Sequence, residues 1–290
     1  MTIQKRLQSK EFVVLAEMNT PKGVDISRFM TDARRIKGRI DGIVVPDMDN
    51  GVMRMSALAG GALVQQQGIE AIIHVYGRDR NRMALQGDLL AAHVLGIQNL
   101  IVVHGEDMPN SDHRTAVPVD DLDELGLLAA IRSLQAGKDL AGFDLDGQPE
   151  FYVGCQLAPF ADETEMICEL DLAKDKIAAG AAFIVTPPVF DLGRFDKLMQ
   201  KASSLGVPVI PTVFLIKSVA VARYIATHEP GAHISEDLIR RIRKASDREL
   251  EGVKIAGETI SQLRKTAHGV LIQAMGWEHR LSAILDAASI

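Results

Sequence analysis

Ionisable and amide side chains follow several short apolar runs of this sequence, at the point where each run ends. Glu17 follows VVLA, His74 follows AII, His104 follows LIVV, and Gln156 ends the run FYVGCQ. A carboxylate in such a setting can serve as a general acid, because an apolar environment raises its pKa toward neutrality. A histidine there can donate a hydrogen bond to a ligand. The pattern indicates proton transfer and ligand binding rather than a structural role alone.

Each of these residues also has a structural interpretation. Glu17 could be an exposed strand end, although an ionisable group beside an apolar run is costly to bury unless it is paired or functional. His74 and His104 could bind a metal, but a two-histidine site needs a third ligand at a definite spacing, so we expect no metal. Cys155 is better explained as a small core residue than as a nucleophile.

Two charged clusters leave alternatives open. The run RDRNR, Arg78–Arg82, could be a solvated helix start, or its arginines could hold a phosphate or carboxylate at a helix N-terminus. Glu278 and Arg280 could pair with each other on the surface, or Arg280 could face a ligand.

The elements that position these residues alternate regularly. Short apolar runs predict strands, and the stretches between them carry apolar residues at helical spacing. Glycines precede the runs, and we interpret each of them, Gly42 and Gly269 included, as closing a helical stretch. Asp162 with Glu165 has the spacing of a capping box, and Asp191 is a further expected N-cap. The predicted strands are 12–17, 41–46, 70–75, 99–104, 151–155, 182–187, 208–213 and 269–274.

Eight such strand–helix units predict an α/β protein, a TIM (β/α)8 barrel formed by residues 1–290 as a single domain. A doubly wound open sheet is the alternative, but no GxGxxG follows the first strand. Residues 214–267 exceed one crossover and predict two or three helices. Residues 106–120 predict a long loop at the rim where such barrels keep their sites.

Composition excludes several classes of protein. Hydrophobic residues make up 47% of the 290, which supports a sizeable core. The net charge of −6 and the lack of a long basic run argue against nucleic-acid binding. Two cysteines cannot form a disulfide framework, and no apolar run approaches the roughly 20 residues of a membrane span. The first residues, MTIQKRLQSKEF, lack the apolar segment of a signal peptide, so we expect a cytoplasmic enzyme without membrane attachment.

Several segments, in order, give the chain a resemblance to the methylenetetrahydrofolate reductases, flavin-dependent TIM barrels that reduce 5,10-methylenetetrahydrofolate to 5-methyltetrahydrofolate. It looks most similar to a short bacterial branch that has the RDRNR…ALQ run and the GWE ending. The segments are VLAEMNTPKGVD (14–25), DMDNGVMRMS (47–56), HVYGRDRNRMALQGDLLAAHVLGIQNLIVVHGED (74–107), KIAAGAAFIVTPPVFD (176–191) and GVLIQAMGWEHRLSAIL (269–285).

The resemblance implies roles for particular residues. Glu17 matches the catalytic acid of the family, and Glu106 would be a second catalytic carboxylate that also contacts the flavin. His74, His104, Gly105 and Lys176 would bind the flavin, Lys176 near its phosphate portion. Gln156 and Arg280 would contact the folate. Two positions depart from the family pattern, because Glu106 replaces an aspartate and Pro187 replaces a folate-binding glutamine.

The resemblance also implies partners. The cofactor would be FAD, with FMN as the alternative, and the electrons would come from NADH, NADPH or an electron-transfer subunit. The product belongs to one-carbon metabolism and methionine biosynthesis, and the protein would form a homo-oligomer or a hetero-complex. Two other functions stay open. One is a flavin- or pterin-binding barrel that works only with an electron-transfer partner, and the other is a flavin-free methyl-pterin methyltransferase.

Overall fold

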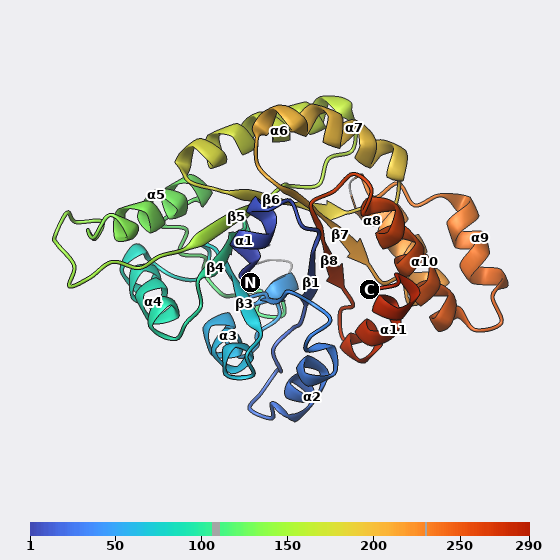
Figure 1. Ribbon diagram of the computed structural model, residues 1–290, viewed down its shortest axis with the longest axis horizontal. Helices are drawn as coiled ribbons and strands as arrows, with labels where there is room; N and C mark the ends of the chain where they lie inside the picture. The colour runs from blue at the N-terminus through green and yellow to red at the C-terminus, as the bar shows by residue number, and fades with distance from the viewer. Residues whose placement is uncertain (106–110, 230) are drawn as a thin grey trace.

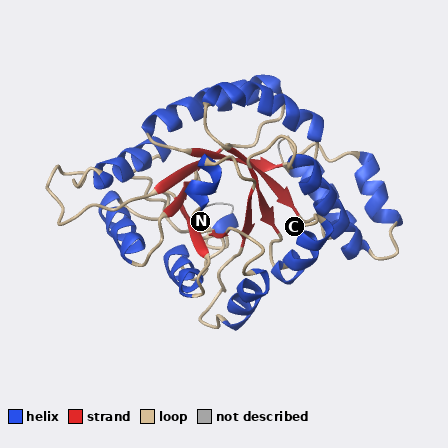
Figure 2. Ribbon diagram, in the orientation of Figure 1, coloured by secondary structure: helices blue, strands red, loops and turns tan. Residues whose placement is uncertain are grey.

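Eight parallel strands close into a barrel with helices around its outside (Figures 1 and 2). The computed structural model describes residues 1–105, 111–229 and 231–290. Each strand pairs with the next in chain order, and β8 pairs with β1 to close the ring. The strands are β1 (Val13–Glu17), β2 (Gly42–Val45), β3 (Glu70–Val75), β4 (Asn99–Val102), β5 (Tyr152–Gln156), β6 (Phe183–Pro188), β7 (Val209–Phe214) and β8 (Gly269–Gln273). The predicted TIM barrel is confirmed, and every strand lies within two residues of its predicted bounds.

The helices pack their apolar stripes against the outer face of the barrel. They are α1 (Ile3–Gln8), α2 (Ser27–Ile36), α3 (Ala57–Gln66), α4 (Arg82–Val94), α5 (Glu124–Gln135), α6 (Glu163–Ala179), α7 (Leu192–Ala202), α8 (Val219–His228), α9 (Glu236–Lys244), α10 (Arg248–Leu263) and α11 (Leu281–Ala287). The stretch 214–267 holds α8, α9 and α10, as its length predicts. Among the described residues, no helix combines the length and apolar character that crossing a bilayer requires.

Alternate residues of each strand face opposite sides of the barrel wall, which makes two separate apolar clusters. Val13 and Leu15 of β1 belong to the cluster inside the barrel, whereas Val14 and Ala16 belong to the cluster under the helices. Inside, the rings of Tyr152 and Phe183 stack with their centroids 5.1 Å apart. The interior is therefore a packed core, and a ligand has room only at its ends.

Helix α1 covers the end of the barrel where the strands begin. Its Ile3 and Leu7 side chains join the interior cluster, and the Ile3 backbone N–H donates to Glu70 at the start of β3. In Figure 1 this helix lies over the centre of the ring. Because this end is covered, the open rim is the one formed by the carboxyl ends of the strands.

The helix starts match the sequence signals. Asp162 accepts hydrogen bonds from the N–H groups of Thr164 and Glu165, and Glu165 accepts one from Ala161 N at 2.6 Å. Asp191 caps α7 by accepting from Arg194 N at 3.1 Å. Both predicted caps are confirmed.

The interpretation of the preceding glycines is wrong for two of them. Gly42 and Gly269 are the first residues of β2 and β8 and close no helix. A Cβ on Gly42 would lie 2.6 Å from Ile3 Cδ1, and one on Gly269 would lie 2.5 Å from the Val13 carbonyl oxygen. These two glycines serve close packing at the covered end of the barrel.

We expect Gly154→Ala to lower the free energy of unfolding by about 1–3 kcal/mol, because overpacking a filled core forces its neighbours to shift. A Cβ on Gly154 would collide with the Phe183 ring inside the barrel. Urea unfolding measures the change.

Gly87→Ala is the matched control, because Gly87 lies in α4 with nothing within 4 Å of an added Cβ. It should raise the free energy of unfolding by about 0.5–1 kcal/mol. Equal effects of the two substitutions would contradict the packing of the barrel interior described above.

Candidate active site

The open rim carries polar side chains that share the interior register of their strands. Each lies an even number of residues from an apolar side chain of the interior cluster, so it points into the mouth of the barrel. These residues are Glu17 on β1, His74 on β3, Gln156 on β5, Thr212 on β7 and Gln273 on β8. Glu17, His74 and Gln156, three residues predicted for the site, are thereby brought to one rim.

Glu17 is a buried carboxylate at this rim, with 3% of its surface exposed. It lies directly opposite Gln273 in the β1–β8 ladder, and Gln273 Nε2 donates to Glu17 Oε2 at 2.8 Å. A carboxylate fixed by an amide in this way has a defined direction toward the mouth. Gln273 falls within the strand predicted at 269–274, and its role becomes evident only from the pairing of β1 with β8.

His74 is partly buried at the same rim. Burial lowers the pKa of its imidazole to about 4, so the ring is neutral at physiological pH. A neutral imidazole offers one donor and one acceptor to a ligand, rather than a positive charge.

Glu124, the first residue of α5, joins two of the predicted flavin-binding residues. Its carboxylate lies 2.7 Å from Lys176 Nζ and 3.8 Å from His104 Nδ1. Lys176 is buried and also donates to the Gln156 carbonyl at 3.2 Å, whereas the His104 side chain is 85% exposed. Lys176 therefore lies beside β5 with its charge engaged by Glu124, a residue that sequence reasoning missed. Glu106 lies outside the described residues.

Arg280 stands apart from the rim residues. Its guanidinium pairs with Glu249 at the start of α10, while Glu278 accepts from the Gly276 N–H at 2.7 Å. The surface ion pair of Glu278 with Arg280 is therefore absent among the described residues, since Arg280 binds Glu249 instead. Arg280 also does not line either of the two cavities described at the mouth of the barrel. The predicted folate contact of Arg280 stays a prediction.

The arginines of the RDRNR run contact carboxylates of the chain itself. Arg80 donates to Asp47 at 2.7 Å and pairs with Asp88, and Arg82 binds Asp121. Arg78 is buried, and it pairs with Asp79 and donates to the Tyr76 hydroxyl at 2.9 Å. These contacts favour a structural role for the run, because they tie the ends of β2 and β3 to the start of α4.

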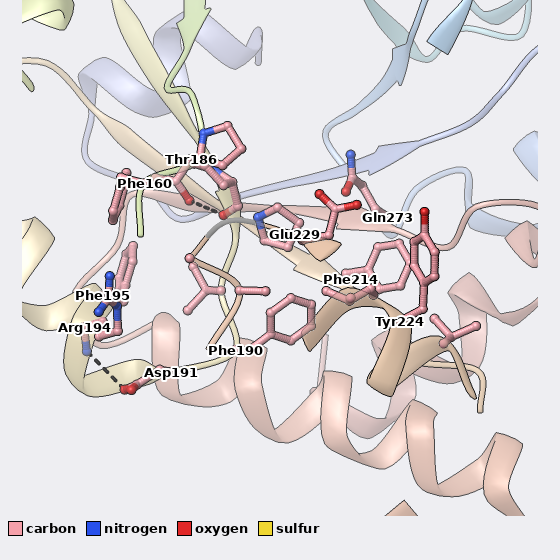
Figure 3. Close-up of a pocket in the computed structure, with 18 of the residues that line it drawn as sticks. Phe160, Thr186, Phe190, Asp191, Arg194, Phe195, Phe214, Tyr224, Glu229 and Gln273 are labelled. Atoms are coloured by element: carbon pink, nitrogen blue, oxygen red, sulfur yellow. Dashed lines mark hydrogen bonds between the residues drawn. The ribbon is translucent and has the colours of Figure 1, made fainter. Parts of the chain in front are cut away.

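A cavity of about 530 Å³ opens beside the mouth, between the ends of β6, β7 and β8 and the helices α7 and α8 (Figure 3). Gln273 lines it, so the cavity meets the rim at the residue that binds Glu17. Aromatic and proline side chains form part of its walls, with Phe160, Pro187, Pro188, Phe190, Phe195, Phe214 and Tyr224 among them. A flat, partly aromatic ligand suits such walls.

Comparison with known proteins identifies what the chain is similar to. A sequence profile described as methylenetetrahydrofolate reductase matches residues 2–289. An uncharacterized protein from Clostridium thermocellum that binds two copies of 5-methyl-5,6,7,8-tetrahydrofolic acid has a TM-score of 0.64 at 14% identity, over 99% of this chain and 97% of that one. A 2,3-dimethylmalate lyase has a TM-score of 0.55 at 9% identity, over 99% and 85%. At these identities the two structures show a shared fold.

The neutral state of His74 makes stability depend on pH. The pKa of His74 is about 4 in the folded protein and about 6.5 in the unfolded chain. At a pH between these two values, His74 therefore takes up a proton only in the unfolded chain. The resulting stability is complete above pH 6.5 and is lost as the pH falls toward 4. Between pH 7 and 5 the wild type should lose about 1–2 kcal/mol more than His74→Gln. Urea unfolding at both pH values checks this, and parallel losses would contradict the burial of His74.

Proposed function

Because this chain belongs to the methylenetetrahydrofolate reductase family, we propose that it reduces 5,10-methylenetetrahydrofolate to 5-methyltetrahydrofolate with a bound flavin. The observation that carries the proposal is the buried Glu17 carboxylate at the open rim, held by Gln273 beside the aromatic cavity. The folate bound by the Clostridium thermocellum protein of the same fold is consistent with it.

The reaction requires a proton donor beside the nitrogen that departs from the bridging carbon. The bridging carbon of the substrate must become an iminium before it can accept hydride, and opening the ring requires a proton on the departing nitrogen. Glu17, as the general acid, would give that proton directly or through a water molecule. Gln273 would keep the carboxyl group directed toward the mouth during the transfer.

The cavity would hold the folate so that its pterin reaches Glu17. The pterin must lie near the inner end, where Gln273 lines the wall, since the departing nitrogen N10 is joined to the pterin ring by a single methylene. The aromatic walls toward α7 and α8 would pack against the rest of the molecule. Gln156, on the interior face of β5, would reach the same mouth.

The residues at the rim of β3 to β5 suit the uncharged, planar isoalloxazine ring of a flavin. His74 is uncharged and can donate or accept, and Gly105 adopts φ of +86° after β4, a conformation that favours glycine. His74, His104, Gly105 and Lys176 would hold the flavin, as FAD or FMN, and Glu106 would contribute from outside the described residues. The bound flavin would supply the hydride. Its electrons would come from NADH, NADPH or an electron-transfer subunit.

Glu17→Gln should lower kcat by about 10²- to 10⁴-fold, because the amide keeps the shape of the side chain but cannot give a proton. The absorption spectrum of the flavin should be unchanged, since no flavin-binding residue is altered. Conversion of 5,10-methylenetetrahydrofolate to 5-methyltetrahydrofolate measures kcat. Anaerobic bleaching of the flavin with NADH, NADPH or methyltetrahydrofolate identifies which of them can reduce it.

Glu163→Gln is the control, because it makes the same chemical change at an exposed position. Glu163 lies at the start of α6, where it pairs with Lys201. This variant should behave as wild type. A protein that carries and reconstitutes no flavin, or a Glu17→Gln variant with nearly normal turnover, would overturn the proposal.

A further inference from the structure

Most polar groups at the inner end of the cavity or next to it are already used by the protein. The Thr186 hydroxyl donates to the Pro187 carbonyl at 2.8 Å, and the Thr212 hydroxyl donates to the Thr186 carbonyl at 2.7 Å. Gln273 gives one of its two amide N–H groups to Glu17, and Pro187 has no side-chain donor. A ligand with an oxygen at this end therefore meets few unused donors, and a further donor must come from elsewhere in the wall.

Lys217 supplies such a donor. It lines the cavity three residues beyond β7, is half-buried, and its ammonium donates to the Met275 carbonyl. The ladder between β7 and β8 continues to this point, since Leu215 N donates to the Gln273 carbonyl at 2.9 Å. Lys217 is thereby held beside the strand end that carries Gln273.

The ammonium retains capacity for a ligand. An ammonium group has three N–H donors, and Met275 accepts one of them. The nitrogen also lies 5.6 Å from the centre of the Trp277 ring, which stabilises its charge. Burial lowers the pKa of this lysine, which indicates that its surroundings do not fully replace water around the charge.

The other cation of the cavity wall lies on the side opposite Gln273 (Figure 3). Arg194 belongs to the first turn of α7, and its guanidinium donates to the Ala161 carbonyl at 3.0 Å, in the loop before α6. Lys217 is thus the cation that the fold ties to the Gln273 end, where the pterin must lie for Glu17 to reach the adjoining departing nitrogen N10.

We propose that Lys217 donates a hydrogen bond to the ring carbonyl oxygen of the bound pterin and so orients the substrate toward Glu17. The inference rests on the proposed function. It assigns Lys217 the recognition of the pterin itself rather than of the glutamate part of folate, because the glutamate extends away from the reacting nitrogen.

Titration with two probes tests the assignment. In the purified protein, with its flavin content measured, Lys217→Met should weaken binding of 5-methyltetrahydrofolate by about 10- to 100-fold, the effect of losing a charged hydrogen bond. Binding of 6-methyltetrahydropterin, which lacks the glutamate, should weaken by the same factor. Calorimetry measures both, and Trp277 emission is a second signal because the sequence has one tryptophan.

Three variants complete the design. Lys217→Arg keeps the charge and the donors and should restore most of the affinity, whereas Lys217→Gln, a milder change, should still lose it and covers a failure of Lys217→Met to fold. Lys174→Met, on the exposed face of α6 where Lys174 pairs with Asp171, should bind as wild type.

The outcomes separate the two proposals. Wild-type protein that binds neither probe would overturn the proposed function. Wild-type binding with less than a twofold change in Lys217→Met and Lys217→Gln would overturn the role of Lys217 alone. A loss confined to the folate, with the pterin unaffected, would show that Lys217 contacts the glutamate and would equally overturn the assignment.

Discussion

The pairing of β8 with β1 is the constraint on which the rest of the structure depends. It converts a row of parallel strands into a ring, and it brings together Glu17 and Gln273, which are 256 residues apart in the chain. Closure also removes both sheet edges, so every strand is paired on both sides. The Glu17 carboxylate and the Gln273 amide that directs it therefore lie on the two strands whose pairing closes the barrel.

The two ends of the barrel have opposite roles because different residues close them. At one end α1 covers the interior with Ile3 and Leu7, and Gly42 leaves room for it. At the other end the interior positions change from apolar to polar within two residues, from Leu15 to Glu17 and from Leu271 to Gln273. The apolar packing inside the barrel thus lies at the end covered by α1 and in the middle, and the polar rim is available for chemistry.

Around the rim, charged groups divide into those that hold the protein together and those that face the mouth. Arg80 and Arg82 contact carboxylates of the chain, and Lys176, which we propose also to contact the flavin, pairs with Glu124 of α5. These pairs connect the segments that follow β2, β3 and β4, and Lys176 also contacts the end of β5. The cavity lies on the other side, beside β6 to β8, where the walls are aromatic and few cations are present. The ion pairs therefore lie around the ends of β2 to β5, and the cavity lies at the ends of β6 to β8.

The sequence by itself determined the strands, the caps at Asp162 and Asp191 and the TIM barrel, because these follow from local periodicity and from side-chain hydrogen bonds within one turn. It also placed Glu17 and His74 at strand ends. Only the tertiary structure decided which groups they meet. The Gln273 partner of Glu17, the Glu124 link to Lys176, the glycines at Gly42 and Gly269 and the position of Lys217 all depend on contacts between distant segments. Such contacts leave no periodic signal, since each is set by how strands and helices pack in three dimensions.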